Sequence, residues 1–128
     1  MPERARVLVV DDDVEQRALW GALMECMGHA PVRAESGDEA LRMLEREAFD
    51  LAIATVTMRG MEGMNFGKII RGMCADLPVV LLAGPGDRVE ATLERGMVAL
   101  LSPVSLDTME SVVTEILARP PGAKKPIA

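Results

Sequence analysis

The sequence has almost no aromatic residues: two phenylalanines, one tryptophan and no tyrosine among 128 residues. It has a single histidine, His29, and two cysteines, Cys26 and Cys74. The cysteines form neither a C-x-x-C motif nor the spacing of a disulfide framework. Because both lie among helix-forming residues, we expect buried or half-buried free thiols.

Long apolar runs are also missing. The longest are about four or five residues, against the ~20 needed to span a bilayer, and no apolar segment follows "MPERAR" as a signal peptide would require. The formal charge is −6, and no Lys/Arg cluster precedes the last ten residues. We therefore expect a soluble, cytoplasmic protein that binds neither nucleic acid nor membrane through this domain.

The remaining composition indicates one compact domain. The chain is 49% hydrophobic, and its length suits a single sizeable core. After Leu117 the sequence changes to "ARPPGAKKPIA", where three prolines and a glycine disfavour a packed element. We predict a domain over residues 1–118 and a tail or linker over residues 119–128.

Strand-length apolar runs alternate with helical patterns along the chain, which predicts an α/β fold with a doubly wound parallel sheet. The clearest strand is "RVLVV" (Arg6–Val10), and four more are predicted at residues 31–35, 50–56, 78–83 and 98–102. Five helices are expected. The first covers Val14–Met27 before Gly28, the second follows a capping box at Ser36 and Glu39, and a short one covers Asp87–Arg95.

Two of these helices carry apolar stripes that we expect to face the sheet. One has the i, i+3, i+4, i+7 spacing and the other extends it over three turns. Their members are Phe66, Ile69, Ile70 and Met73 in the first, and Leu106, Met109, Val112, Val113, Ile116 and Leu117 in the second.

Ligands of open parallel sheets bind at the carboxyl ends of the strands, where this sequence places Asp11, Asp12, Asp13, Thr55, Ala83, Gly84, Ser102 and Pro103. Adjacent carboxylates there suggest a Mg²⁺ site, because an acidic pair needs a compensating cation or hydrogen-bond donors. The alternative is that Asp13 caps the first helix and that all three carboxylates suit its positive end.

At this point the sequence resembles the receiver domains of bacterial two-component response regulators. The resemblance covers Arg6 to Leu117 and rests on "VLVVDDD", "ESGDEALRMLE", "FDLAIATVTMRGMEGMNF", "LPVVLLAG" and "LLSPVSLDTMESV". It implies a flavodoxin-like sheet in the order 2-1-3-4-5 with five helices. It also implies phosphorelay signal transduction, in which a histidine kinase phosphorylates an aspartate.

The resemblance assigns each of the family's functional groups to a position in this chain. Most of these positions carry a different residue. The acidic pair that holds Mg²⁺ maps onto Asp11 and Asp12, but the phosphoaccepting aspartate maps onto Thr55. The switch hydroxyl maps onto Ala83, and the lysine maps onto Ser102, beside Pro103. The aromatic switch has only Ala99 or Leu100 in its place, and Arg59 replaces the loop proline.

These replacements predict an atypical receiver, or pseudo-receiver. Unlike a carboxylate, the hydroxyl of Thr55 needs a general base, and His29 is expected at the opposite edge of the sheet. Asp50 cannot substitute, because five residues of strand place it roughly 16 Å away at the wrong end. With Thr55 in place of an anionic oxygen, we expect no cofactor, or Mg²⁺ bound only weakly. We expect the acidic pair to be poorly compensated, and Arg59 is the residue most able to reach it.

The resemblance also implies a partner surface on the fourth helix, fifth strand and fifth helix, although exposed charges are more commonly just solvated. The candidates are Arg88, Glu90, Glu94, Arg95, Asp107, Thr108 and Glu110. The implied partner is a histidine kinase, an output domain or another regulator, and a homodimer is left open. Met58, Met61 and Met64 in the loop suit either adaptable contacts or core packing.

Three functions compete. The first is a phosphorylation-independent interaction module in a signalling pathway, with no enzyme activity. The second is a phosphoryl-accepting response regulator that uses a nonstandard acceptor. The third is a Mg²⁺-dependent phosphate enzyme built on Asp11, Asp12 and Thr55, which lacks a nucleophile, a lysine and a Gly-rich phosphate loop.

Overall fold

Five parallel strands form one sheet in the computed structural model. They are β1 (Arg6–Val10), β2 (Ala30–Ala34), β3 (Leu51–Thr55), β6 (Val79–Ala83) and β7 (Met97–Leu101). Their spatial order is β2-β1-β3-β6-β7, and every neighbouring pair is parallel. This confirms the order 2-1-3-4-5. The described residues are 4–58, 61–62, 68–70, 72–74, 76–84 and 97–118.

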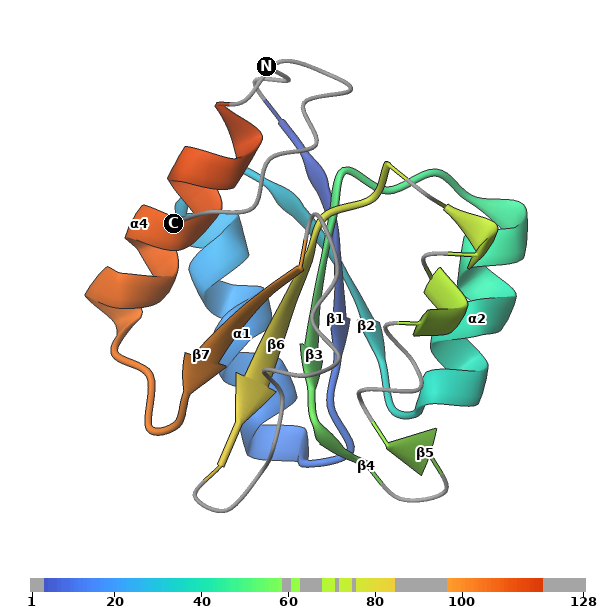
Figure 1. Cartoon of the computed structure of the whole chain (residues 1–128). Coiled ribbons are helices and arrows are strands. Elements are labelled where there is room, and N and C mark those ends of the chain that lie inside the picture. Colours follow the sequence, from blue (N-terminus) through green and yellow to red (C-terminus); the bar gives the residue numbers. More distant parts are fainter. Residues whose placement is uncertain are drawn as a thin grey trace.

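Helices cover both faces of the sheet (Figure 1). Helices α1 (Val14–Cys26) and α4 (Leu106–Leu117) lie on one face, and α2 (Gly37–Arg46) lies on the other. Residues 68–70 and 72–73 are also helical, whereas the helix expected at Asp87–Arg95 lies outside the described residues. Among the described helices, none has both the length and the apolar character needed to cross a membrane.

The core consists of two layers, one on each face of the sheet, because alternate strand side chains point to opposite faces. Leu8 and Val10 of β1 join the layer that includes Ala40 and Leu44 of α2. Val7 and Val9 join the layer that includes Trp20, Met24, Met109 and Val113 from α1 and α4. Strands buried on both faces explain the continuous apolar runs of the sequence.

The predicted helix ends are present, and they fix the loops around the sheet. Ser36 Oγ accepts a hydrogen bond from the Glu39 N–H at 3.1 Å, as the capping box predicts. The Glu39 carboxylate accepts from the Glu35 N–H at 2.9 Å, one residue before the expected partner. After α1, Gly28 has a φ of 87°, a conformation that glycine adopts without strain.

Four apolar or thiol side chains are more exposed than predicted: Ile69, Met73, Leu106 and Cys26. Ile70 and Met109 are fully buried in the same stripes, so each stripe is wider than the strip of helix that contacts the sheet. The burial of Cys26 was predicted wrongly because α1 has apolar residues on both sides, so that periodicity does not identify its buried face. Cys74 is half-buried as expected, and neither cysteine forms a disulfide.

The loop after β3 contains a short antiparallel ladder that was not predicted. It joins β4 (Thr57–Met58) to β5 (Met61–Glu62), with Thr57 opposite Glu62. Two-residue strands are too short to produce an alternating hydrophobic pattern. The backbone therefore turns back on itself immediately beyond Thr55 and Val56.

Candidate functional site

The strand ends bring most of the predicted site residues to one edge of the sheet. Thr55 is the last residue of β3 and pairs with Leu82, next to Ala83 at the end of β6. The Ser102 N–H, directly after β7, donates to the Ala83 carbonyl at 2.7 Å. Asp11, directly after β1, donates its N–H to the Ala34 carbonyl at 3.2 Å. We call Asp11, Asp12, Thr55, Ala83 and Ser102 the strand-end site.

The polar groups of this site differ in exposure. The Ala83 side chain is fully buried and offers no hydroxyl, whereas Thr55 is half-buried at its strand end. Ser102 and Pro103 are exposed. The site therefore has a buried apolar side chain at residue 83 and no positively charged side chain at residue 102.

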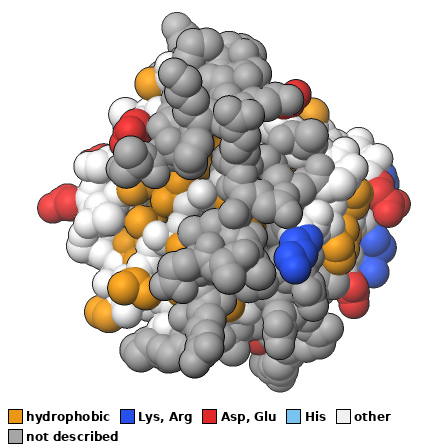
Figure 2. Space-filling view, viewed as in Figure 1, with side chains coloured by type: hydrophobic (Ala, Val, Ile, Leu, Met, Phe, Trp, Pro, Cys, Tyr) orange, Lys and Arg blue, Asp and Glu red, His pale blue; other side chains and the backbone are white. Residues whose placement is uncertain are grey.

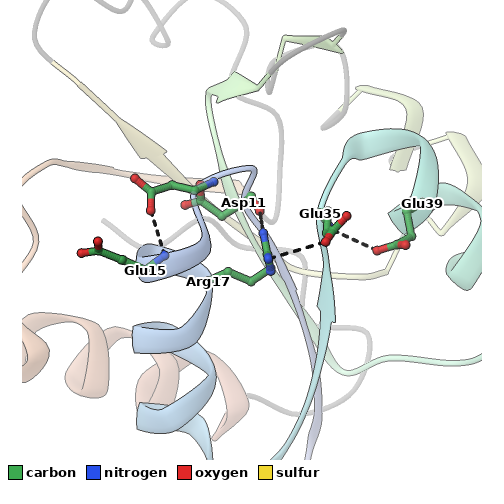
Figure 3. Close-up of polar contacts among 6 residues, drawn as sticks. Asp11, Glu15, Arg17, Glu35 and Glu39 are labelled. Atoms are coloured by element: carbon green, nitrogen blue, oxygen red, sulfur yellow. Dashed lines mark hydrogen bonds and ion pairs between the residues drawn. The ribbon is translucent and has the colours of Figure 1, made fainter.

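The three consecutive aspartates have different roles. Asp11 is only 5% exposed, and its Oδ1 accepts a hydrogen bond from the Asp13 N–H at 2.9 Å. Asp13 is the N-cap of α1, because its Oδ1 accepts from the N–H groups of Glu15 at 2.9 Å and Gln16 at 3.3 Å. The capping role considered for Asp13 is therefore present, and Figure 3 shows Glu15, whose N–H donates to this cap, at the start of α1.

Burial raises the pKa of the Asp11 carboxyl above its ordinary value, because desolvation disfavours the charged form. The negative charges of Asp12 and Asp13 raise the pKa further. The hydrogen bond from the Asp13 N–H and the guanidinium of Arg17 act in the opposite direction without cancelling the effect of burial. Asp11 is thus a carboxylate held in unfavourable surroundings.

Arg17, on the second turn of α1, is the cation that our sequence reasoning missed. Its Nη1 donates to the Asp11 carbonyl oxygen at 2.8 Å, and its Nη2 lies 3.8 Å from the Glu35 carboxylate. Figure 3 shows the guanidinium between these two residues. The sequence signal for this contact is local. Arg17 follows the N-cap Asp13 by four residues, so its side chain lies about one helical turn further along and can reach back to the loop before the helix. Arg59, named in the sequence analysis as the residue most able to reach the acidic pair, lies outside the described residues.

The residues of the strand-end site do not fit the Mg²⁺ that the family resemblance implies. Magnesium needs near-octahedral oxygen ligands, usually including one or two carboxylates. Asp13 caps α1, one Asp11 oxygen is hydrogen-bonded to the backbone, and Thr55 offers a neutral hydroxyl. Among the described residues, no group of three or more His, Cys, Asp or Glu side chains is arranged to hold a metal.

Asp50 and His29 lie away from this site, as predicted. The Asp50 carboxylate accepts from the Arg6 N–H at 2.8 Å, at the opposite end of β1 from Asp11. His29 is buried at 8% exposure, and its Nδ1 accepts from the Ala5 N–H at 3.0 Å. Neither residue can serve as an acceptor or a base at Thr55.

Part of the predicted partner surface is described, and it has an apolar component that was not predicted. Asp107, Thr108 and Glu110 are exposed on α4, although the Thr108 hydroxyl and N–H also contact Ser105 at the helix N-cap. Leu101 and Leu106 are exposed by 72% and 47%. Figure 2 shows hydrophobic side chains gathered on the side of β7 and α4. Arg88, Glu90, Glu94, Arg95 and Met64 lie outside the described residues.

Comparison with known proteins gives a consistent result. The sequence model of the response regulator receiver domain matches residues 7–114. The transcriptional regulatory protein GlrR of Escherichia coli K12 is 35% identical over 116 residues, which are 88% of this chain and 26% of that protein. The response regulator protein FleR of Pseudomonas aeruginosa is 40% identical over 97 residues, which are 72% of this chain and 20% of that protein.

Solved structures agree with the sequence comparison. The chemotaxis response regulator CheY4 of Vibrio cholerae superposes with a TM-score of 0.77 and 25% identity, covering 88% of this chain and 98% of CheY4. NtrX from Brucella abortus, in complex with ADP, superposes with a TM-score of 0.81 and 28% identity, covering 89% of this chain and 27% of NtrX. The chain thus spans about a quarter of the length of GlrR and NtrX and nearly all of CheY4.

Proposed function

The chain belongs to the response regulator receiver family of two-component signalling, and we propose that it is an atypical receiver that acts by phosphorylation-independent protein–protein interaction. The observation that carries the proposal is Thr55, a half-buried hydroxyl at the end of β3, at the position where the family resemblance leads us to expect the acceptor aspartate. A carboxylate is ionised at neutral pH and can attack a phosphoryl group, whereas a threonine needs a base to do so.

The groups around Thr55 support this proposal. Asp11, a candidate base of the strand-end site, already accepts a hydrogen bond from the Asp13 N–H at its Oδ1. Residue 102 is serine, so no ammonium group balances the charge of a phosphoryl transition state there. Ala83 provides no hydroxyl to respond to a phosphoryl group, and its side chain is fully buried. The residues at all three positions, Thr55, Ser102 and Ala83, therefore differ from the acceptor, lysine and switch hydroxyl that the family resemblance implies.

We propose that this domain has no enzyme activity of its own and works through its surface. Four residues between the end of β7 and the first two turns of α4 are exposed: Leu101, Leu106, Asp107 and Glu110. Apolar side chains surrounded by charges are typical of sites that bind other proteins. The partner would be a histidine kinase, an output domain or another regulator, and relatives such as GlrR are much longer than this chain.

The test is phosphorylation with a small donor. The chain is incubated with acetyl phosphate and Mg²⁺, and its intact mass is measured before and after. We expect no change in mass, while a receiver with an acceptor aspartate, treated in parallel, should gain one phosphoryl group. A gain of one phosphoryl group by this chain would overturn the proposal, and peptide mapping would then identify the nonstandard acceptor.

A further inference from the structure

We infer that the outer edge of β7 binds an extended segment of a partner protein, whose apolar residues are flanked by basic ones and which adds a strand to the sheet. The inference deepens the proposed function and rests on it, because it names the kind of partner that this surface takes. Strands β2 and β7 are the two end strands of the five-stranded sheet (Figure 1). The outer main-chain groups of an end strand are able to pair with an added strand.

The main-chain hydrogen bonds show which residues of β7 point outward. In a parallel strand, alternate residues direct both their N–H and their C=O to the same neighbouring strand. The Ser102 N–H donates to the Ala83 carbonyl of β6 at 2.7 Å, so residues 98 and 100 also face β6. Ala99 and Leu101 therefore direct their N–H and C=O groups away from the sheet. Leu101 is 72% exposed and Ala99 is half-buried, so solvent reaches both residues.

The opposite edge of the sheet, at β2, is protected against an added strand. The Ala30 N–H donates to the Ala5 carbonyl at 2.8 Å, so Ala30 and every second residue after it face β1. The outward positions of β2 are therefore Pro31 and Arg33. Proline has no N–H to offer a further strand, and a charged residue on an edge also disfavours pairing. Strand β7, with the sequence MVALL, contains neither a proline nor a charge.

The charge of α4 indicates which partner suits this edge. Val98 and Leu100 of β7 pack in the same core layer as Met109 and Val113, so α4 lies beside β7 (Figure 1). Helix α4 contains three acidic residues and no basic one. Antiparallel pairing of β7 with that of a second copy would bring two such helices together, and their like charges would repel. A partner strand flanked by Lys or Arg would instead be attracted.

The tail of this chain is unsuited to the edge of β7. Residues 119–128 contain Pro120, Pro121 and Pro126. An added strand must offer N–H groups along its length, and proline has none. We therefore assign the edge to a segment of another protein.

The experiment titrates the chain with a capped synthetic peptide, Lys-Val-Thr-Val-Thr-Val-Lys, and follows the backbone amide NMR shifts of Ala99 and Leu101. Valine and threonine favour extended backbone, and the two lysines supply the basic flanks. We expect saturable shifts at these two amides, while the amide of Arg33 at the other edge of the sheet stays unchanged. A peptide with glutamates in place of the lysines should bind about fivefold more weakly or worse, because its charges are repelled.

Ala99→Pro tests the edge directly, because it removes the outward N–H without removing a hydrogen bond to β6. We expect this variant to bind the lysine peptide about fivefold more weakly or worse, as the loss of one hydrogen bond implies. Leu106→Pro is the matched control. Leu106 follows the N-cap Ser105 as the first residue of α4, a position where proline is favoured. This variant should bind the peptide as the parent does.

The absence of shifts at Ala99 and Leu101 would overturn the inference, as would equal binding of the lysine peptide by the parent and Ala99→Pro. Equal affinity for the lysine and glutamate peptides would overturn the assignment of a basic partner. A parent that sediments as a dimer while Ala99→Pro is a monomer would also overturn it, because the edge would then belong to a second copy.

If Ala99→Pro does not fold, two further peptides are titrated into the parent, one N-methylated at its valines and the other at its threonines. Alternate residues of a strand direct their N–H groups to opposite sides, so one of these peptides should lose binding and the other should keep it. Equal binding of both would overturn the inference. A gain of one phosphoryl group from acetyl phosphate would refute the proposed function, whereas these peptide titrations decide the role of the edge.

Discussion

At the residue scale, ionised Asp11 is unfavourable in the folded state, because its carboxylate is buried. Its pKa is raised by burial, then by the charges of Asp12 and Asp13. The unfolded chain therefore ionises Asp11 at about its ordinary value of 3.8, before the folded chain does. The stability that Asp11 contributes is fully present below that pH and is lost as pH rises through the folded-state pKa. At neutral pH the ionised side chain favours unfolding.

We predict that Asp11→Asn raises the free energy of unfolding at pH 7 by roughly 0.5 to 2 kcal/mol. Asparagine removes the charge, and its Oδ1 can still accept from the Asp13 N–H. The gain should disappear at pH 3, where the aspartate of the parent is protonated in both states. Urea denaturation at the two pH values measures the difference.

Asp38→Asn is the control for this experiment, because Asp38 is an exposed carboxylate at the start of α2. It should change stability by less than about 0.5 kcal/mol. Asp12→Asn, at a half-buried position, should act in the same direction as Asp11→Asn. If Asp11→Asn is less stable than the parent at pH 7, then Arg17 and the Asp13 N–H compensate the charge fully.

The replacement of the acceptor residue leads to a second prediction. Thr55→Asp alone should not be phosphorylated by acetyl phosphate and Mg²⁺, because residue 102 is still serine and residue 83 is still alanine. The new carboxylate would also add negative charge near Asp11, whose pKa is already raised. Intact mass measures the result. The matched comparison is the triple variant with Ala83→Thr and Ser102→Lys, and efficient labelling of Thr55→Asp alone would contradict the prediction.

At the scale of elements, the start of α1 determines where the aspartates point. The side chain of Asp13 accepts from two N–H groups of the first turn, and its own N–H donates to Asp11. Unpaired N–H groups at a helix start are stabilised by such caps. The helix terminus thus uses one of the three carboxylates and orients a second, which leaves Asp12 as the half-buried neighbour at the site.

We predict that Asp13→Ala lowers the free energy of unfolding by about 1 kcal/mol, because the cap is lost. Asp13→Ser should recover most of this loss, since serine caps helices nearly as well. Chemical denaturation of the three proteins gives the values. An alanine variant as stable as the parent would show that Asp13 does not stabilise α1, and the metal-ligand interpretation of Asp13 would then need to be considered again.

The elements were predictable from sequence to different degrees. Most strands were predictable because strands buried on both faces read as apolar runs, whereas the edge strand β2 is only partly buried and contains Arg33. The observed strand ends differ from the expected ones by one residue or less. Ile69 and Met73 were placed wrongly, because a periodic stripe shows which residues share a helix side but not how much of that side is covered. The ladder of β4 and β5 was missed because two residues carry no period.

The strand-end site was predictable only in its main-chain part. Asp11, Thr55, Ala83 and Ser102 follow or end strands, so the parallel order brings them together. The role of Arg17 depends on the face that α1 turns toward the loop after β1, and that face is set by tertiary packing of Trp20 and Met24. A sequence pattern that is apolar on both sides of α1 does not specify it.

At the scale of the whole molecule, a tight cation site would be visible in global stability. A ligand that binds the folded state adds RT ln(1 + [L]/Kd) to the free energy of unfolding. For Mg²⁺ at about 10 mM and a Kd of similar size, this is about 0.4 kcal/mol, or about 2 °C in Tm for a domain of this length. A site with a hundredfold lower Kd would add about 2.7 kcal/mol and roughly 10 °C.

We therefore predict that Mg²⁺ at about 10 mM raises the Tm of the parent by no more than about 2 °C. Sodium chloride at equal ionic strength serves as the reference, because salt alone screens the repulsion among the acidic residues of a chain with net charge −6. Differential scanning calorimetry measures both melts. Since tight binding cannot leave Tm unchanged, a rise of roughly 10 °C over the reference would mean that Asp11 and Asp12 hold Mg²⁺ despite Arg17 and Thr55.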